Sequence, residues 1–178
     1  MATRDGPVPF SKVKIRTGAL VFCDKDVALI RRDRPAGTYY TTPGGNVEPG
    51  EDLLAALGRE LAEELRLDLA HATSPELCWI QDQMVTRPGP EPPPRKLHLT
   101  FRCFITSDTR ARLATTEYDQ QPGGGHEPGF IEWVSYCKAA EIPLFPFIGH
   151  ALARLPSPGA PVGSLLLEPI TDASYTWI

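Results

Sequence analysis

Acidic residues gather around one arginine in the first half of the sequence. Glu51 is followed by the pair Arg59-Glu60 and then by the pair Glu63-Glu64. On a helix, glutamates at positions i, i+3 and i+4 project from one face and repel each other by roughly a few tenths of a kcal/mol per pair. Mg²⁺ and Mn²⁺ prefer carboxylate oxygens as ligands. The cluster is therefore either a solvated helix face or a site that holds divalent cations, and composition alone favours the solvated face.

A helix after a turn-rich segment would present these carboxylates together. Residues 34–51 are dense in Gly and Pro, which predicts a loop. The residues from Asp52 to about Leu67 favour a helix. Four leucines fall within one stripe at about 100° per residue and predict its buried face: Leu54, Leu57, Leu61 and Leu65.

Strands should supply the sheet on which this helix packs. Segments 13–22 and 26–33 are β-rich and separated by a polar break, which predicts a hairpin. Segments 76–85, 96–106 and 131–137 predict further strands. In segment 96–106 hydrophobic residues alternate with residues that should face a cleft or solvent, namely His98, Thr100, Arg102 and Phe104.

Two further loops and a short helix complete the expected chain. Prolines in residues 88–94 predict a stiff, extended loop that could cover a pocket, and residues 119–130 predict a flexible Gly/Pro loop. Residues 144–155 predict a short helix. The apolar tail that follows is β-prone, so it should either pack on the domain or form the interface of a homodimer.

Charge and cysteine content narrow the class of protein. With a formal net charge of -4 and a pI near 5.6, the chain lacks the basic surface expected of a nucleic-acid-binding protein. It has no apolar run of about 18 residues, so we expect no membrane span, and no signal peptide, which predicts a cytoplasmic protein. Its four cysteines form no CxxC pair and are expected to be buried, reduced thiols: Cys23, Cys78, Cys103 and Cys137.

The order of the acidic residues resembles the signature of the Nudix hydrolases, the MutT-like family, GX5EX7REUXEEXGU with U an aliphatic residue. Arg66 stands where the family usually has Gly, which puts the helix C-cap in question rather than the chemistry. The sequences "PGG" before the box and "IEWVSY" late in the chain agree with the family pattern. The matching positions are Gly45, Glu51, Arg59, Glu60, Leu61, Glu63, Glu64 and Leu67.

The resemblance implies a fold and a reaction. The expected fold is α/β, a Nudix α/β/α sandwich with a mixed, curved β-sheet. Residues 13–155 would form the domain, with an N-terminal extension at 1–12 and a C-terminal tail at 156–178. The reaction would be hydrolysis of a phosphoanhydride bond in a small-molecule nucleoside diphosphate derivative, with Mg²⁺ or Mn²⁺ to neutralise the phosphate oxygens.

Roles for the box residues also follow from the resemblance. Glu60, Glu63 and Glu64 would ligate the metal, with the backbone carbonyl near Gly45 as a further ligand. Arg59 would orient carboxylates, Glu51 among them, and Gly44 and Gly45 would allow a tight loop. The general base stays open between Glu60, Glu64 and a late carboxylate. Glu127 is the candidate for that late carboxylate and for a metal ligand, although an ordinary loop carboxylate is an equal alternative, and His126 beside it could assist, although a loop histidine is usually only solvated.

The substrate is the least defined part of the prediction. A nucleoside triphosphate or another nucleoside diphosphate derivative is the default, because the sequence after the box, "IQDQMVT", matches no specific subgroup. A regulatory module that binds a nucleotide without hydrolysing it is the alternative, although such proteins commonly lose box carboxylates. Candidate phosphate or base contacts, each also open to a structural role, are Arg32, Gln83, Arg102 and Phe104.

Overall fold

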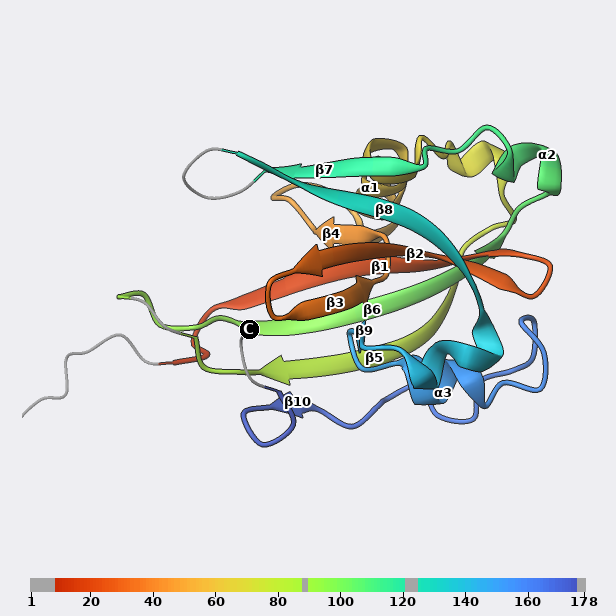
Figure 1. The fold of residues 1–178 in the computed structure, drawn as a ribbon. Helices are drawn as coiled ribbons and strands as arrows, with labels where there is room; N and C mark the ends of the chain where they lie inside the picture. Colours follow the sequence, from red (N-terminus) through yellow and green to blue (C-terminus); the bar gives the residue numbers. More distant parts are fainter. Residues whose placement is uncertain (1–8, 88–89, 121–124, 176–178) are drawn as a thin grey trace, which may run out of the picture.

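One curved, mixed β-sheet runs through the protein (Figure 1). The computed structural model describes residues 9–87, 90–120 and 125–175. Along the main path the strand order is β10-β5-β6-β1-β2-β3-β9, with β4 paired to β1 and β8 paired to both β2 and β7. The strands are β1 (Val13–Cys23), β2 (Asp26–Arg34), β3 (Gly37–Thr41), β4 (Gly44–Asn46), β5 (Glu76–Met84), β6 (Arg95–Phe104), β7 (Thr116–Gln120), β8 (His126–Ser135), β9 (Leu144–Phe145) and β10 (Ile170–Thr171).

Short helices cover the sheet on both sides (Figure 1). The longest, α1, lies with α2 on one side, while α3 and the 3₁₀ helix η2 lie on the other. This three-layer arrangement with a mixed sheet confirms the predicted α/β/α fold. The helices are α1 (Leu53–Leu65), η1 (Leu69–His71), α2 (Ser107–Arg110), η2 (Tyr136–Glu141) and α3 (Gly149–Ala153).

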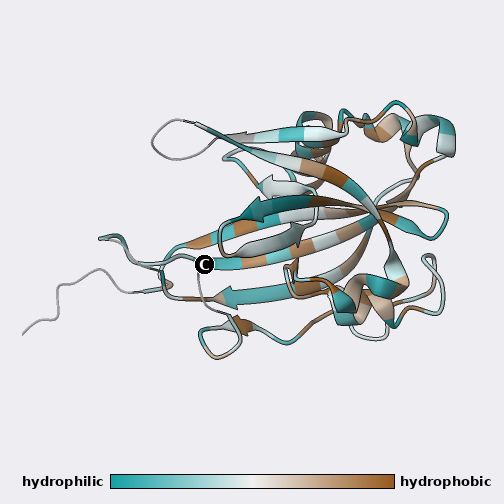
Figure 2. Cartoon of the chain, in the orientation of Figure 1, coloured by the Kyte–Doolittle hydropathy of each residue, from teal (hydrophilic) through white to brown (hydrophobic). Residues whose placement is uncertain are grey.

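The first two strands form the predicted hairpin, and the sheet continues through β6 and β5. The β1-β2 hairpin turns at residues 24–25, and β1 lies parallel to β6 along its whole length, from Val13 opposite Arg95 to Phe22 opposite Phe104. Strand β5 pairs antiparallel with β6. Figure 2 shows hydrophobic and hydrophilic bands alternating along these long strands, because successive side chains point to opposite faces.

Two segments predicted as loops contain strands, so those predictions were wrong. In the segment 34–51, β3 pairs with β2 and β4 pairs with β1. Gly44 adopts φ +140°, and a Cβ there would lie 2.1 Å from the Thr17 carbonyl oxygen, so glycine is what allows β4 to approach β1. In the segment 119–130, residues 126–130 begin β8 and pair with β7, while residues 121–124 lie outside the described residues. In both cases a neighbouring strand makes hydrogen bonds to the backbone of the segment. The Gly and Pro content alone could not indicate this pairing.

Helix α1 follows the turn at residues 48–51 and carries the predicted carboxylates. The Asp52 side chain caps its first turn, accepting hydrogen bonds from the amides of residues 54 and 55. Leu57, Leu61 and Leu65 are fully buried against the sheet, but Leu54 is 47% exposed, so its assignment to the buried stripe was wrong. Leu54 lies in the first turn, where the helix projects beyond the sheet-facing core cluster.

Arg66 ends α1 in the left-handed conformation, with φ 55° and ψ 33°. The amide of Arg66 donates to the carbonyl of Ala62 at 3.1 Å, and the amide of Leu67 donates to the carbonyl of Leu61 at 3.0 Å. These two bonds close the helix in the way that a glycine usually does. The departure from the family pattern therefore changes the residue and keeps the cap.

The C-terminal tail lies along the outer edge of the sheet. Ile170 is fully buried, β10 pairs parallel with β5, and the Gln81 side-chain amide donates to the Glu168 carbonyl at 2.8 Å. In the Pro-rich segment, residues 88–89 are outside the described residues and Pro93 accepts a backbone hydrogen bond from Phe10 at 2.9 Å. No helix in the described ranges is long and apolar enough to cross a membrane.

The four cysteines are all free thiols, as predicted. Cys23, Cys78 and Cys103 are buried, and burial raises the pKa of the Cys103 thiol to about 12. Cys137 is exposed, so its predicted burial was wrong. It lies in η2, whose buried positions are Tyr136 and Ala139.

Candidate active site

A polar cavity of about 350 Å³ opens between α1 and the strands that face it. Strand β1 forms its floor, β4 brings the glycine turn to the start of the cavity, and β6 supplies a further wall. Its lining combines two carboxylates with two guanidinium groups, in addition to hydroxyl and aromatic side chains. The side chains that matter for chemistry are Arg16, Arg32, Tyr39, Thr42, Glu60, Glu64, His98, Thr100 and Phe145.

The carboxylates of Glu60 and Glu64 reach the cavity because the opposing backbone is glycine. A Cβ at Gly45 would lie 2.1 Å from Glu60 Oε1, so any larger residue would displace that carboxylate. The amide of Gly44 donates to Glu64 Oε2 at 2.7 Å. The two glycines of the box thus give one glutamate its space and the other its hydrogen bond.

Arg59 fixes the acidic cluster from one side. Its guanidinium donates to both oxygens of Glu51, at 2.9 and 3.1 Å, and to Glu60 Oε1 at 2.8 Å. It also donates to the Asn46 carbonyl at 3.0 Å, which ties α1 to the glycine turn. Glu63 lies 3.6 Å from Arg59 with a side chain 61% exposed, and it does not line the cavity. Arg59 consequently holds Glu60 in place without occupying the cavity itself.

The surroundings of Glu64 disfavour the ionised form of its carboxylate. Burial first, and then the nearby carboxylates of Glu117 and Glu60, raise the pKa of Glu64 to about 8. The Gly44 amide and Arg16 lower it, but not enough to compensate. A cation bound between Glu60 and Glu64 would favour the ionised carboxylate, so the site suits a positively charged ligand.

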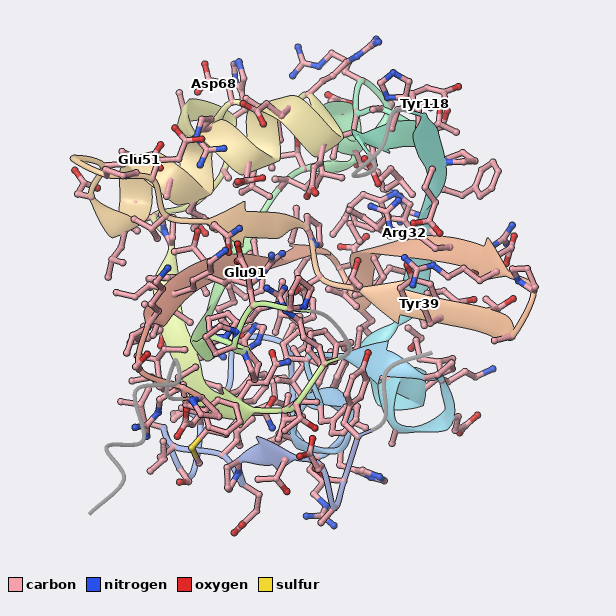
Figure 3. All side chains as sticks on the ribbon, turned by 90° about the vertical axis from the view of Figure 1, so that its left-hand side faces the viewer. Arg32, Tyr39, Glu51, Asp68, Glu91 and Tyr118 are labelled. Atoms are coloured by element: carbon pink, nitrogen blue, oxygen red, sulfur yellow. The ribbon has the colours of Figure 1, made fainter. Side chains whose placement is uncertain are left out.

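Two arginines give the cavity its cationic groups. Arg16 on β1 donates to the Gly44 carbonyl at 3.2 Å. Arg32 on β2 is buried, where it donates to the Glu117 carboxylate and, at 3.4 Å, to the Glu127 carbonyl. Figure 3 shows Arg32 beside Tyr39 on the adjacent strand β3, in keeping with their paired register. One guanidinium group can donate two parallel hydrogen bonds to a phosphate, so these arginines suit a phosphate group.

His98 is a neutral group on β6 that lines the cavity. Its Nε2 lies 2.7 Å from Gln83 Oε1, and its ring meets the ring of Phe145 edge-on at 5.4 Å. Burial, then the charges of Arg16 and Lys96, lower the pKa of His98 to about 3. Gln83, predicted to contact substrate, is buried and lies behind His98 rather than in the lining.

The structure does not bring every predicted residue to the cavity. Glu127 lies on β8 and accepts two hydrogen bonds from Arg34, at 2.7 and 2.9 Å, so its carboxylate does not line the cavity. His126, at the start of the same strand, is exposed. The proposed assignments of Glu127 to metal and catalysis gain no support from this geometry.

Two further candidates for substrate contact have structural partners elsewhere. Arg102 is buried and binds the Glu76 carboxylate together with the carbonyls of Pro158 and Ala160, so it anchors the C-terminal tail. Phe104 stacks on Phe22 with ring centroids 5.5 Å apart. Neither residue lines the cavity, because both lie toward the far end of β6 from His98.

Sequence reasoning missed Arg16, His98 and Glu117 as site residues. His98 was predicted to face a cleft or solvent, but nothing in its spacing connects it with the box. Glu117 lies on β7, a strand that the sequence did not predict, and reaches Arg32 through the β7-β8 ladder. Such contacts depend on sheet topology, so no local pattern could have identified them.

The residues present fit a divalent cation in part. Glu60 and Glu64 line one cavity, and burial with neighbouring carboxylates raises the pKa of Glu64, so a bound cation would stabilise its ionised form. In the described part of the chain, however, no three Asp, Glu, His or Cys side chains converge as a ready ligand set. Glu63 points toward solvent, so a complete protein ligand set would require Glu63 to turn or backbone oxygens and water to contribute.

The fold is shared with solved structures of MutT and Nudix proteins. A mutator MutT protein from Bacillus halodurans aligns with TM-score 0.58 and 20% identity, covering 91% of this chain and 93% of that chain. The E. coli ORF135 protein aligns with TM-score 0.54 and 23% identity, covering 83% and 91%. A Nudix hydrolase from Nitrosomonas europaea aligns with TM-score 0.54 and 18% identity, covering 97% and 86%. At these identities the likeness concerns the fold.

The family assignment comes from the sequence match. No curated protein matches the chain. The model of the NUDIX domain matches residues 12–155, which include the whole acidic box and every residue that lines the polar cavity. The chain therefore belongs to the Nudix domain family.

Proposed function

We propose that this Nudix pyrophosphohydrolase cleaves a phosphoanhydride bond of a nucleoside diphosphate derivative, such as a nucleoside triphosphate, with the help of Mg²⁺ or Mn²⁺. The observation that carries the proposal is the one cavity that Glu60 and Glu64 line together with Arg16 and Arg32. A diphosphate needs cations on its oxygens before water can attack, and it needs a carboxylate to hold those cations or to take a proton. Both kinds of group line the one cavity.

Glu60 and Glu64 would hold the cation, with Glu63 and the Gly45 carbonyl as further candidates. The bound ion would supply Lewis acidity to the phosphate oxygens and lower the pKa of water at the site. Arg59 keeps the Glu60 carboxylate in position, and the Gly44 amide does the same for Glu64. Losing either hydrogen bond would leave its carboxylate free to rotate away from the cavity.

Arg16 and Arg32 would bind the phosphates that are not attacked. Arg32 is positioned by the buried Glu117, so its guanidinium is oriented before substrate arrives. Either Glu60 or Glu64 would act as the general base, since both carboxylates line the cavity and Glu127 does not. A small-molecule nucleotide is the expected ligand, while the homodimer and the cytoplasmic location stay predictions.

A hydrolysis screen tests the proposal. Nucleoside triphosphates, nucleotide sugars, dinucleotides and dinucleoside polyphosphates would be incubated with Mg²⁺ or Mn²⁺, and products would be identified by ³¹P NMR in ¹⁸O-labelled water. We expect metal-dependent cleavage of a phosphoanhydride bond that EDTA abolishes. Glu60→Gln and Glu64→Gln should each remove most of the activity with the fold retained, whereas Glu141→Gln, an exposed carboxylate in η2, should leave it unchanged.

Absence of metal-dependent turnover over the whole panel would count against a hydrolase. If ligands then still raise the melting temperature of the protein, the non-hydrolytic binding module becomes the better account. Full activity in both glutamine variants would refute the assignment of Glu60 and Glu64.

A further inference from the structure

A second cavity, of about 240 Å³, adjoins the polar cavity. Tyr39 and Phe145 line both, so the two spaces meet at these rings. The polar cavity holds charged groups, whereas the second is walled mainly by aromatic and aliphatic side chains. A ligand that spans both would have to be charged at one end and apolar at the other.

Three aromatic rings surround one side of this second cavity. The ring of Tyr175 lies 5.4 Å from Phe145 and 5.7 Å from Phe147, and the two phenylalanines are 6.0 Å apart. Their planes are inclined to one another by 44° to 80°, so the rings are not stacked face to face. They can therefore act as walls for a planar group rather than as a closed stack.

Tyr39 and Arg34 also line this cavity. The Arg34 guanidinium lies over the Tyr39 ring, 4.6 Å from its centroid. Its orientation is fixed by the two hydrogen bonds that it donates to Glu127. A fixed guanidinium beside a tyrosine ring favours a planar, electron-rich group that carries carbonyl oxygens.

Tyr175 comes from outside the family domain, which matches residues 12–155, whereas Phe145 and Phe147 lie within it. Thr171 accepts backbone hydrogen bonds from Ser174 and Tyr175, each at 2.9 Å, in a turn that follows β10. The Thr86 amide and hydroxyl donate to the Asp172 carboxylate at 2.8 and 2.9 Å, which ties this turn to the end of β5. Tyr175 is thus held at the cavity by the edge of the sheet.

We infer that the second cavity binds the base of a nucleotide substrate and that Tyr175, from the C-terminal tail, makes one wall of this base site. The inference rests on the proposed function, because it places the phosphates of the same ligand in the polar cavity. It assigns the tail a role in substrate specificity. It also narrows the substrate to one with a planar, aromatic group close to its phosphates.

Binding of ligands that differ only in the base tests this inference. Calorimetry with Mg²⁺ would compare the four nucleoside 5′-monophosphates with ribose 5-phosphate, which keeps the sugar and phosphate. We expect at least one nucleotide to bind about tenfold more tightly than ribose 5-phosphate, since stacking on an aromatic side chain contributes on that order. Tyr175→Ala should remove most of this advantage, and Tyr175→Phe should retain it because the ring remains.

A matched control is Tyr118→Ala. Tyr118 is 67% exposed on β7, and Figure 3 places it well apart from Tyr39, so its removal should leave nucleotide binding unchanged. Circular dichroism melting curves would establish that both alanine variants are folded. Phe147→Ala provides a second test should Tyr175→Ala unfold, because Phe147 lines the same wall and is 40% exposed.

Equal affinity for nucleotides and ribose 5-phosphate, including no measurable binding of either, would overturn the inference. So would an unchanged nucleotide advantage in both folded variants, Tyr175→Ala and Phe147→Ala. These binding results do not depend on turnover. A protein that prefers nucleotides but hydrolyses nothing would refute the proposed function alone, while a metal-dependent hydrolase with no preference for the base would refute the base site alone.

Discussion

Replacing Arg66 by glycine should stabilise the protein, because Arg66 holds a left-handed conformation at the end of α1. A residue with a Cβ in this conformation costs about 1 kcal/mol or more relative to glycine. Arg66→Gly also removes a cation from the helix C-terminus, which costs about 0.3 kcal/mol at an exposed position. The Arg66→Ala variant shares this second loss but keeps the Cβ. We therefore expect the glycine variant to exceed the alanine variant by about 1 kcal/mol in free energy of unfolding.

Urea denaturation followed by circular dichroism would measure both variants. A difference of about 1 kcal/mol corresponds to a shift of about 2–4 °C in Tm for a chain of this size. Gly58 is the matched control: it lies within α1, and a Cβ there would meet its nearest neighbour, Leu69 Cδ1, at an ordinary 3.4 Å. At position 58 the alanine variant should have a free energy of unfolding about 0.5–1 kcal/mol higher than the protein with glycine. At position 66 the glycine variant should be more stable than the alanine variant. If alanine equals or exceeds glycine at position 66, the account of this helix end is wrong.

Three further substitutions test other parts of the site. Gly45→Ala should abolish most activity, since its Cβ would lie 2.1 Å from Glu60 Oε1, and a metal titration should show the loss of affinity that follows displacement of this carboxylate. Removing one partner of the buried Arg32–Glu117 pair, as in Glu117→Ala, should cost about 3–5 kcal/mol in urea denaturation, whereas little change would show that the pair is hydrated. His98→Gln should reduce the loss of unfolding free energy that the wild type shows at acidic pH. The pKa of His98 is lowered to about 3 in the folded protein, so on acidification the unfolded state takes up a proton before the folded state does. The free energy of unfolding of the wild type should therefore decrease as the pH falls below about 6.5, by about 2 kcal/mol at about pH 5. An equal decrease in the variant would contradict this.

Much of the fold could be predicted from local patterns. The β1-β2 hairpin, the strands β5 and β6 and the helix α1 follow from hydrophobic periodicity and turn residues, which act over short stretches of chain. The strands β3, β4 and β7 could not be predicted in this way. They are short or rich in Gly and Pro, and their backbone groups are satisfied by partners that only the assembled sheet supplies.

The site residues likewise include some that local sequence patterns predict and some that only the assembled sheet brings together. The box fixed the positions of Glu60 and Glu64 along one helix, and the structure places both in the cavity. Arg102 and Phe104 were chosen for their chemistry on a strand with the expected alternation, but the C-terminal tail binds Arg102 and the buried ring of Phe22 stacks on Phe104. Arg16 and His98 are opposite each other in the β1-β6 register, a relation between distant segments that composition does not reveal.

Binding of Mn²⁺ measures the central claim most directly, because it asks whether the helix carboxylates hold a cation. Electron paramagnetic resonance would follow free Mn²⁺ during titration of the wild type, Glu60→Gln, Glu64→Gln and the control Glu141→Gln. We predict that the wild type and Glu141→Gln bind Mn²⁺ alike, and that each box variant binds at least about tenfold more weakly, since loss of one charged ligand removes a major share of the attraction. Equal binding by all four proteins, or no binding by the wild type, would contradict a metal site at Glu60 and Glu64.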